Sequence, residues 1–152
     1  GKELTSVIMP NHYLLKMGWA QYALGNRAIN RLQSINIERK EAAQLYSKFL
    51  MENGKISVPD QFFPNHLFLK YPILVNDRQG FVIKAEKEKM LLGDWFISPI
   101  HPVKKEFEKW DLDISQFPVA AYITNHVANL PTNFQDPKRV IAFLSNNLDD
   151  LM

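Results

Sequence analysis

Hydrophobic positions recur at a helical spacing through the first third of the chain. Between Tyr13 and Asn53 the apolar residues fall mostly three or four positions apart, the period of a helix with one buried face. The pair Asn53-Gly54 is a typical helix stop, whereas Gly25 and Asn26 are typical of a break near the start. We therefore predict one long helix, or two helices in series.

The pattern then changes to short apolar runs. Residues 66–75 are almost continuously apolar and rich in Val, Ile and Phe, which predicts a buried strand. Pro72 lacks a backbone donor and places this strand at an edge or a bulge. Shorter runs at 95–97 and 127–130 predict a second and a third strand.

Helix signals separate these strands. We predict helices from the cap Asn76-Asp77 to about Leu92, from Pro118 to about His126, and from Asp136-Pro137 to Leu151. The order predicts an α+β fold, in which a long N-terminal helix precedes a small, mainly antiparallel three-stranded sheet with helices on one face. With 152 residues, the chain is expected to form a single domain over residues 1–152.

Composition narrows the possible partners and chemistry. The net charge of +2 is too small to indicate nucleic acid or an anionic membrane as a partner. There is no cysteine, which excludes disulfides, thiolate metal sites and cysteine nucleophiles, and which suits a cytoplasmic location. No apolar run reaches the roughly 18–20 residues that span a bilayer.

The sequence lacks several common motifs of catalytic, phosphate-binding and metal-binding sites. It contains no glycine-rich phosphate loop, no H-x-x-x-H metal motif and no G-x-S-x-G nucleophile elbow. The four histidines show no spacing that is typical of a metal site; they are His12, His66, His101 and His126. We therefore expect no metal site and no complete catalytic group within the chain.

Two irregular segments are the candidates for function. In residues 93–102 a predicted strand runs into a loop made rigid by two prolines, and this segment carries Trp95 and His101. The alternative is a purely structural loop with Trp95 in the core. In residues 10–25, Tyr13 and Lys16 lie at the entry to the long helix, where the alternative is the ordinary start of an amphipathic helix.

Taken in order, these segments resemble the C-terminal part of the DegT/StrS family of aminotransferases. Members of that family are fold-type-I enzymes that use pyridoxal phosphate (PLP) to aminate keto-sugar nucleotides. The resemblance covers about residues 9–150, and its strength lies in the order of the pieces. These are Lys16-Met17-Gly18, Gln21-Tyr22-Ala23-Leu24-Gly25, Arg31-Leu32, Tyr46, Tyr71-Pro72-Ile73-Leu74-Val75, Gly93, Trp95-Phe96, Pro99-Ile100-His101, Phe117-Pro118-Val119-Ala120 and Asn129-Leu130-Pro131-Thr132.

The resemblance implies roles for both candidate segments. In such enzymes the entry loop approaches the cofactor phosphate of the neighbouring subunit, commonly through an Asn placed two residues before an Arg. Here Leu14 and Lys16 occupy those positions, so the implied cofactor contacts are Lys16, which has charge but no bidentate fork, together with Asn11 and Tyr13. The Pro-x-His loop of the family lies near the sugar nucleotide, which implies substrate binding by His101 and stacking on Trp95.

The resemblance also implies what the chain does not contain. The Schiff-base lysine, the aspartate for the pyridine nitrogen and the aromatic stacking partner belong to a preceding large α/β domain, which we expect to lie outside these 152 residues. We therefore expect the chain to pair with that domain, to contribute to a homodimer, and to be inactive and without PLP alone. The parent enzyme would transfer an amino group, from glutamate as the expected donor, to a keto-sugar.

Three alternatives remain open from the sequence. The parent could be a related dehydratase, because the residue that separates the two reactions lies outside the chain. The chain could instead be a stand-alone interaction domain of the same fold without catalysis. It could also be an unrelated small α+β ligand-binding domain.

Overall fold

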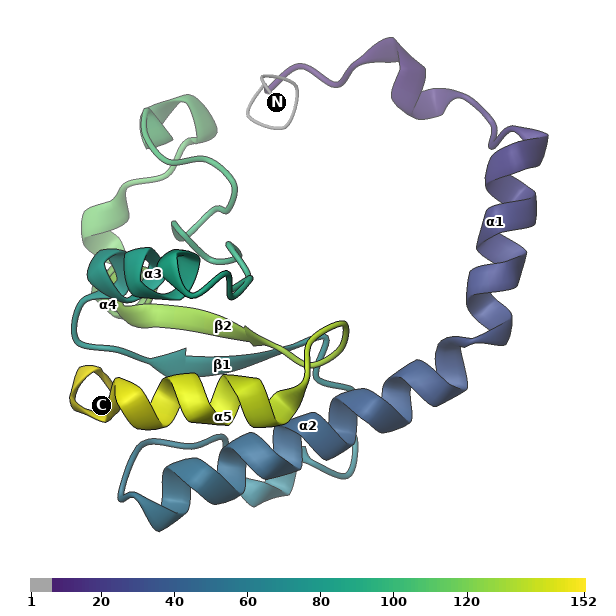
Figure 1. The fold of residues 1–152 in the computed structure, drawn as a ribbon. Coiled ribbons are helices and arrows are strands. Elements are labelled where there is room, and N and C mark those ends of the chain that lie inside the picture. The colour runs from purple at the N-terminus through teal and green to yellow at the C-terminus, as the bar shows by residue number, and fades with distance from the viewer. Residues whose placement is uncertain (1–6) are drawn as a thin grey trace.

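The computed structural model describes residues 7–152 and has an α+β fold (Figure 1). The helices and strands are α1 (Trp19–Asn30), α2 (Leu32–Glu52), β1 (Lys70–Leu74), α3 (Arg78–Lys87), α4 (Pro118–His126), β2 (Val127–Pro131) and α5 (Pro137–Asn146). Short 3-10 turns add Asn11–Leu14, Asp60–Phe62, Phe107–Trp110, Ile114–Gln116 and Leu148–Asp150. The predicted class, α+β, is confirmed.

The N-terminal helical region consists of two helices in series, one of the two predicted arrangements. The break lies at Arg31, whose backbone N–H bonds to the carbonyls of both Ala28 and Ile29. It does not lie at Gly25, which sits inside α1. The predicted stop is confirmed, because Gly54 adopts a left-handed φ of 66° and its N–H bonds to Met51 in a glycine-capped helix end.

The sheet contains two antiparallel strands. Its register runs from Lys70 opposite Pro131 to Leu74 opposite Val127. Because side chains alternate along a strand, Tyr71 and Ile73 share one face with the residues paired to them, Leu130 and Ala128, and all four are buried. Every residue of β2 is buried, whereas Pro72 on the other face of β1 is exposed, as expected for an edge strand.

The prediction of a strand at Trp95–Ile97 is wrong, and the sheet therefore has two strands instead of the predicted three. Only Gly93 reaches the sheet, through a single antiparallel bridge to Asn129. Phe96 then adopts a left-handed φ of 61°, which turns the chain away before a ladder can form. The Trp95 carbonyl is meanwhile held by the Asn129 side-chain amide rather than by a strand neighbour. The third strand is therefore replaced by an anchored turn.

Helices α2, α3 and α5 enclose the core on the face of Tyr71 and Ile73. The small residues of α2, Ala42 and Ala43, are buried and allow close packing, and Tyr46 meets Tyr71 edge to face. Phe81 of α3 and Phe143 of α5 also pack edge to face, with ring centroids 5.1 Å apart. This layer is the helical cover that the sequence predicts.

Two helices end earlier than their apolar patterns predict. α3 ends at Lys87 rather than Leu92, because Lys89 adopts a left-handed φ of 54° and the N–H of Met90 bonds back to Ala85. α5 ends at Asn146 rather than Leu151; its cap Asn147 bends the chain into a 3-10 turn. Leu151 then forms a bridge with Val75 beside the sheet.

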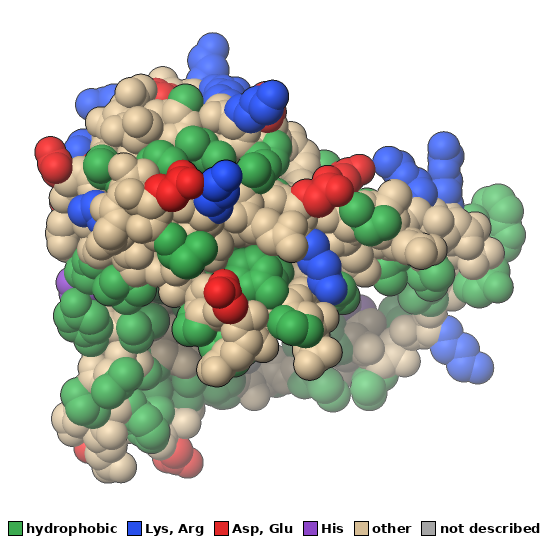
Figure 2. All heavy atoms as spheres, turned by 90° about the horizontal axis from the view of Figure 1, so that it is seen from below, with side chains coloured by type: hydrophobic (Ala, Val, Ile, Leu, Met, Phe, Trp, Pro, Cys, Tyr) green, Lys and Arg blue, Asp and Glu red, His purple; other side chains and the backbone are tan. Residues whose placement is uncertain are grey.

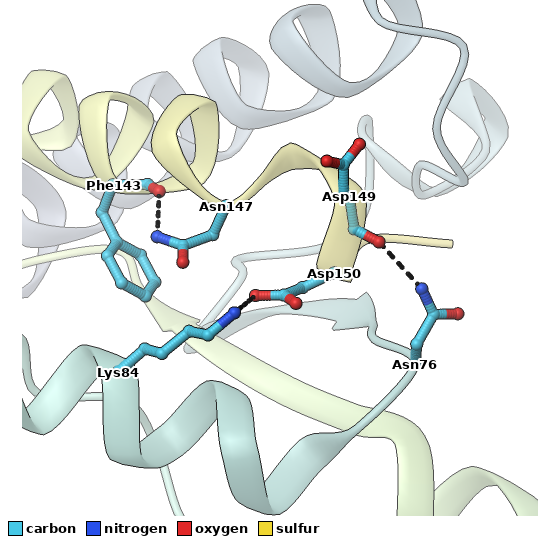
Figure 3. Close-up of polar contacts among 6 residues, drawn as sticks. All are labelled: Asn76, Lys84, Phe143, Asn147, Asp149 and Asp150. Carbon is cyan, nitrogen blue, oxygen red and sulfur yellow. Dashed lines mark hydrogen bonds and ion pairs between the residues drawn. The ribbon is translucent and has the colours of Figure 1, made fainter.

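Polar contacts tie this C-terminal turn to the rest of the fold (Figure 3). Lys84 Nζ lies 2.6 Å from Asp150 Oδ2, and the Asn76 amide donates to the Asp149 carbonyl at 3.0 Å. The Asn147 amide donates to the Phe143 carbonyl at 2.9 Å and satisfies one carbonyl of the last turn of α5. The end of the chain is thus fixed against α3 and the end of β1.

The first part of the chain is an arm (residues 7–31) that curves away from the sheet (Figure 1). No residue is buried between residues 7 and 41. Ile29 and Leu32, which the periodicity places on an inward stripe, are 67% and 47% exposed. The apolar side chains of the predicted helix are buried in the core only from Ala42 onward.

Candidate functional site

Two hydrogen bonds to Asn129 of β2, together called the clasp, hold the segment after α3 against the sheet. Gly93 donates its N–H to the Asn129 carbonyl at 2.8 Å, and the Asn129 side-chain amide donates to the Trp95 carbonyl at 2.9 Å. Asn129 is only 2% exposed, so both bonds are shielded from water. The clasp fixes the point from which residues 95–103 leave the sheet.

The space around position 93 is tight and favours glycine there. A Cβ at Gly93 would lie 3.0 Å from the Asn129 Cβ and 3.3 Å from the Lys70 side chain. The Asn129 Cβ is fixed to the strand and cannot retreat as a flexible side chain can. Gly93 therefore permits the close backbone approach on which the two hydrogen bonds depend.

Trp95 lies at the surface, so the interpretation of this residue as part of the core is wrong. Its side chain is 41% exposed and its ring meets Phe96 edge to face, while Phe96 itself is 54% exposed. The two adjacent aromatic rings are nearly perpendicular, so each offers a separate exposed apolar surface, and an aromatic face of this kind can stack against a planar or sugar ring.

Two polar side chains further along this loop lack partners. Ser98 is 4% exposed, and its hydroxyl has no hydrogen bond within the described residues. The Nδ1 atom of His101 is also buried without a partner there. Because buried polar groups are normally satisfied, these two atoms are the ones in the loop with free hydrogen-bonding capacity.

The second predicted group lies on the arm. Asn11 and Tyr13 belong to the 3-10 turn Asn11–Leu14, and Lys16 follows in the linker to α1, whose first turn is closed by the bond from Gly18 N to Gln21 Oε1. All three predicted residues are exposed, and Tyr13 retains 52% of its accessible surface. They present an amide, a phenol and an ammonium group to solvent.

Trp95 and His101 thus lie in the same loop, and Asn11, Tyr13 and Lys16 lie in the same part of the arm. Sequence reasoning missed Ser98 and Asn129. The signal for Asn129 was a polar residue within an otherwise apolar strand, which predicts a buried hydrogen-bonding role. Ser98 carries no such signal, because serine is common in surface loops.

The lysines of residues 7–152 are all at least partly exposed, whereas the lysine that anchors PLP is typically a desolvated amine. No group of three potential metal-ligating side chains occurs in residues 7–152. None of the helices described is both long and apolar enough to cross a membrane.

Comparison with protein families gives a match over most of the chain. The model of the DegT/DnrJ/EryC1/StrS aminotransferase family matches residues 7–140, which is most of this 152-residue chain. The chain belongs to this family. No curated protein and no solved structure matched it in the parallel comparisons.

Membership of the DegT/DnrJ/EryC1/StrS family accounts for both candidate segments, since the match includes the arm and the loop after Gly93. It removes the alternative of an unrelated small ligand-binding domain. It supports an aminotransferase as the parent protein, and it confirms the resemblance that the ordered motifs indicate.

Proposed function

We propose that this chain forms one wall of the active-site cleft of a PLP-dependent aminotransferase whose acceptor is a nucleotide-linked keto-sugar. Family membership supports the aminotransferase chemistry. The observation that carries the proposal is the loop of residues 93–103, which combines the exposed indole of Trp95 with a His101 imidazole whose Nδ1 atom has no partner among the described residues. This combination suits a sugar nucleotide better than a purely apolar ligand.

On the substrate side, His101 and Trp95 have complementary roles. The Nδ1 atom of His101 is buried without a partner among the described residues, so it would bond to a hydroxyl of the sugar once a shift of the loop exposes it. The Trp95 indole provides an exposed apolar face in the same loop. The clasp at Asn129 fixes the start of this loop at the Trp95 carbonyl.

On the cofactor side, the described residues fit only part of what PLP needs. The exposed Lys16 ammonium and Asn11 amide are suitable phosphate contacts, and the Tyr13 phenol can donate a further hydrogen bond. The covalent lysine does not fit anywhere in residues 7–152. When bound, PLP supplies the electron sink for amino transfer, and we propose that the large domain of the same enzyme holds it.

The exposed apolar surface of the arm favours the proposal that a large protein partner binds there. The exposed apolar side chains of the arm are Val7, Ile8, Met9, Tyr13, Leu14, Leu15, Met17, Trp19, Tyr22, Leu24 and Ile29. Figure 2 shows hydrophobic and basic side chains along the projecting arm. The sequence from residue 4 to residue 37 contains no acidic residue. Contiguous apolar surface of this kind marks a protein interface.

A hollow continues this surface toward the body. It measures about 460 Å³ and is lined by apolar residues of α1 and α2, namely Ile29, Leu32 and Ile37, together with Leu67. We propose that the large PLP-binding domain and a second copy of the enzyme cover the arm and this hollow. Such a homodimer would place the arm of one subunit against the cofactor of its neighbour.

The experiment compares His101→Ala with a matched control, His126→Ala, in the assembled enzyme with PLP, glutamate and a keto-sugar nucleotide. His126 already bonds through Nδ1 to the Tyr122 carbonyl at 2.7 Å and stacks on the Tyr122 ring, so its loss leaves the proposed site intact. We expect His101→Ala to raise KM for the sugar about tenfold, the effect of losing one well-formed polar contact. PLP content is expected to stay unchanged.

Two results would contradict the proposal. One is an equal effect of the two histidine variants on KM. The other is retention of PLP by the isolated 152-residue chain after dialysis, which would place the anchor within it. An assembled enzyme that shows no amino transfer at all, with any keto-sugar nucleotide tested, would favour a non-catalytic interaction domain.

A further inference from the structure

The end of α2 carries a pair of residues with chemistry of its own. Asn53 is the one asparagine in the sequence that is followed by a glycine. The backbone nitrogen that follows an asparagine can attack the side-chain amide, and glycine obstructs this attack least because it has no Cβ. Asn53 and Gly54 are both exposed, so water and base can reach them. This pair is thus the position in the sequence that is most open to loss of an amide.

The reaction at this pair needs water and no other reagent. The Gly54 nitrogen loses its proton and forms a bond to Cγ of Asn53, while the bond from Cγ to Nδ2 breaks and ammonia leaves with that proton. Water then opens the resulting five-membered ring at one of its two carbonyls. The products are an aspartate or an isoaspartate at position 53, together with the released ammonia.

The folded helix end engages both reacting groups in hydrogen bonds. The nucleophile, the Gly54 N–H, donates to the Met51 carbonyl at 3.1 Å. The Nδ2 atom of Asn53 donates to the Phe49 carbonyl at 2.8 Å. Attack requires the first bond to break so that the nitrogen can lose its proton, and the second to break so that the side chain can turn. The closed helix end therefore protects Asn53, and the reaction has to proceed from an open form.

Contacts with the last two residues of the chain hold this helix end closed. Lys55 Nζ donates to the Leu151 carbonyl at 2.8 Å, and the Ile56 N–H donates to the Met152 carbonyl at 2.8 Å. We call these two bonds the seam. Helix ends open more readily than the middle of a helix, and each bond that ties an end to the body reduces the population of the open form. The seam thus controls how often Asn53 becomes reactive.

Either product would weaken the structure that protects Asn53. An aspartate has no amide N–H to donate to the Phe49 carbonyl, and it places a negative charge at a helix C-terminus, where the helix dipole disfavours it. An isoaspartate also adds a methylene to the main chain before Gly54, which shifts Lys55 and Ile56 relative to their partners in the seam. The change would therefore loosen the attachment of the C-terminal residues.

We propose that Asn53 is a site of spontaneous deamidation, that opening of the α2 end controls its rate, and that the modification loosens the seam. Two observations carry the proposal: the hydrogen bonds that engage both reacting groups, and the two bonds that tie this helix end to Leu151 and Met152. The modification site is separate from the arm and from the loop of residues 93–103. It does not depend on the proposed function, and its test needs neither PLP nor amino transfer.

The test compares the full 152-residue chain with a peptide of residues 49–57 in the same mildly alkaline buffer, with deamidation followed by mass mapping. We expect Asn53 to react at least about tenfold more slowly in the folded chain than in the peptide. Lys55→Ala removes the bond to Leu151 and should speed the reaction of the chain about fivefold, measured against a peptide with the same substitution. The matched control is Lys48→Ala, which alters an exposed lysine of α2 that lies 3.9 Å from Glu52 and should leave the rate unchanged.

The effect on the seam is measured by hydrogen exchange after the deamidated chain has been separated by anion exchange. The backbone amides of Ile56 and Met152 should exchange at least about tenfold faster than in the unmodified chain, while amides of the β1–β2 ladder keep their rates. Equal rates of deamidation in the chain and the peptide would overturn the proposal, because the helix end would then give no protection. Equal acceleration by Lys55→Ala and Lys48→Ala, or unchanged exchange at Ile56 and Met152, would also overturn it.

Discussion

The body (residues 42–152) and the arm (residues 7–31) of this chain differ in how their apolar side chains are buried. From Ala42 onward, helices and strands bury their apolar faces against one another, and residues such as Tyr46, Val140 and Leu144 are completely enclosed. Between residues 7 and 31 the sequence is at least as apolar, yet no residue is buried. Trp19, the bulkiest type of side chain, is 84% exposed.

This difference separates a part of the chain that has its own core from a part that has none. The body has a core of aromatic and aliphatic side chains that can stabilise it. The arm has only the local hydrogen bonds of α1, and an isolated helix of 12 residues is marginal in water. The apolar arm is therefore the part of the chain for which we propose a protein partner.

The largest expected effect comes from Phe143→Ala in the body. Phe143 is 1% exposed and packs on Phe81, so its truncation should lower the free energy of unfolding by about 3–5 kcal/mol. The matched change in the arm is Trp19→Ala, for which we expect about 0.5 kcal/mol or less. Urea unfolding followed by circular dichroism measures both, and similar losses for the two variants would remove the distinction between body and arm.

Much of the body could be predicted from sequence because its signals are local and agree with its packing. The helix α4 begins at Pro118 and ends at His126 as predicted, and Gly54 ends α2. The wrong third strand shows the limit. An apolar run at Trp95 indicates a strand, but its conformation is decided by Asn129, which lies 34 residues away in the sequence.

A smaller effect is expected from Tyr46→Phe, which removes one buried hydrogen bond and little volume. The hydroxyl donates to the Pro131 carbonyl at 2.7 Å, and its loss leaves that carbonyl with one partner fewer, at a cost of about 1–2 kcal/mol. The control in the arm is Tyr22→Phe; Tyr22 is 64% exposed, and we expect no measurable change.

The same variant should alter the response to alkaline pH. Burial, and secondly the charge of Asp136, raise the pKa of Tyr46 above its ordinary value of 10.0. The folded state thus keeps a proton that the unfolded state releases, so this contribution is complete below pH 10 and is lost as the pH rises further. Unfolding measured at about pH 8 and about pH 11 should show a steeper loss for the parent chain than for Tyr46→Phe. Equal slopes would show that Tyr46 titrates normally.

The candidate site was predictable only in part. Trp95 and His101 were singled out because a predicted strand runs into a loop that contains Pro99 and Pro102, and the structure anchors the start of this loop at the Trp95 carbonyl. Whether either residue meets a substrate stays a prediction. The missing nitrogen partner of His101 depends on how the loop folds back, which no spacing in the sequence specifies. Whether the arm residues meet a cofactor depends on a partner and stays a prediction.

The smallest effects, of opposite sign, are expected at two glycines. Gly93→Ala would place a Cβ 3.0 Å from the Asn129 Cβ and should cost about 1 kcal/mol by crowding the clasp. Gly25→Ala meets no atom within 4 Å and should favour the α1 helix by about 0.5–1 kcal/mol. Because the arm has no buried contact with the body, this gain should appear as increased helicity at low denaturant, while the unfolding midpoint of the body stays constant. A higher midpoint for Gly25→Ala would mean that the arm and the body unfold as one unit, and the arm would then need no partner for its stability.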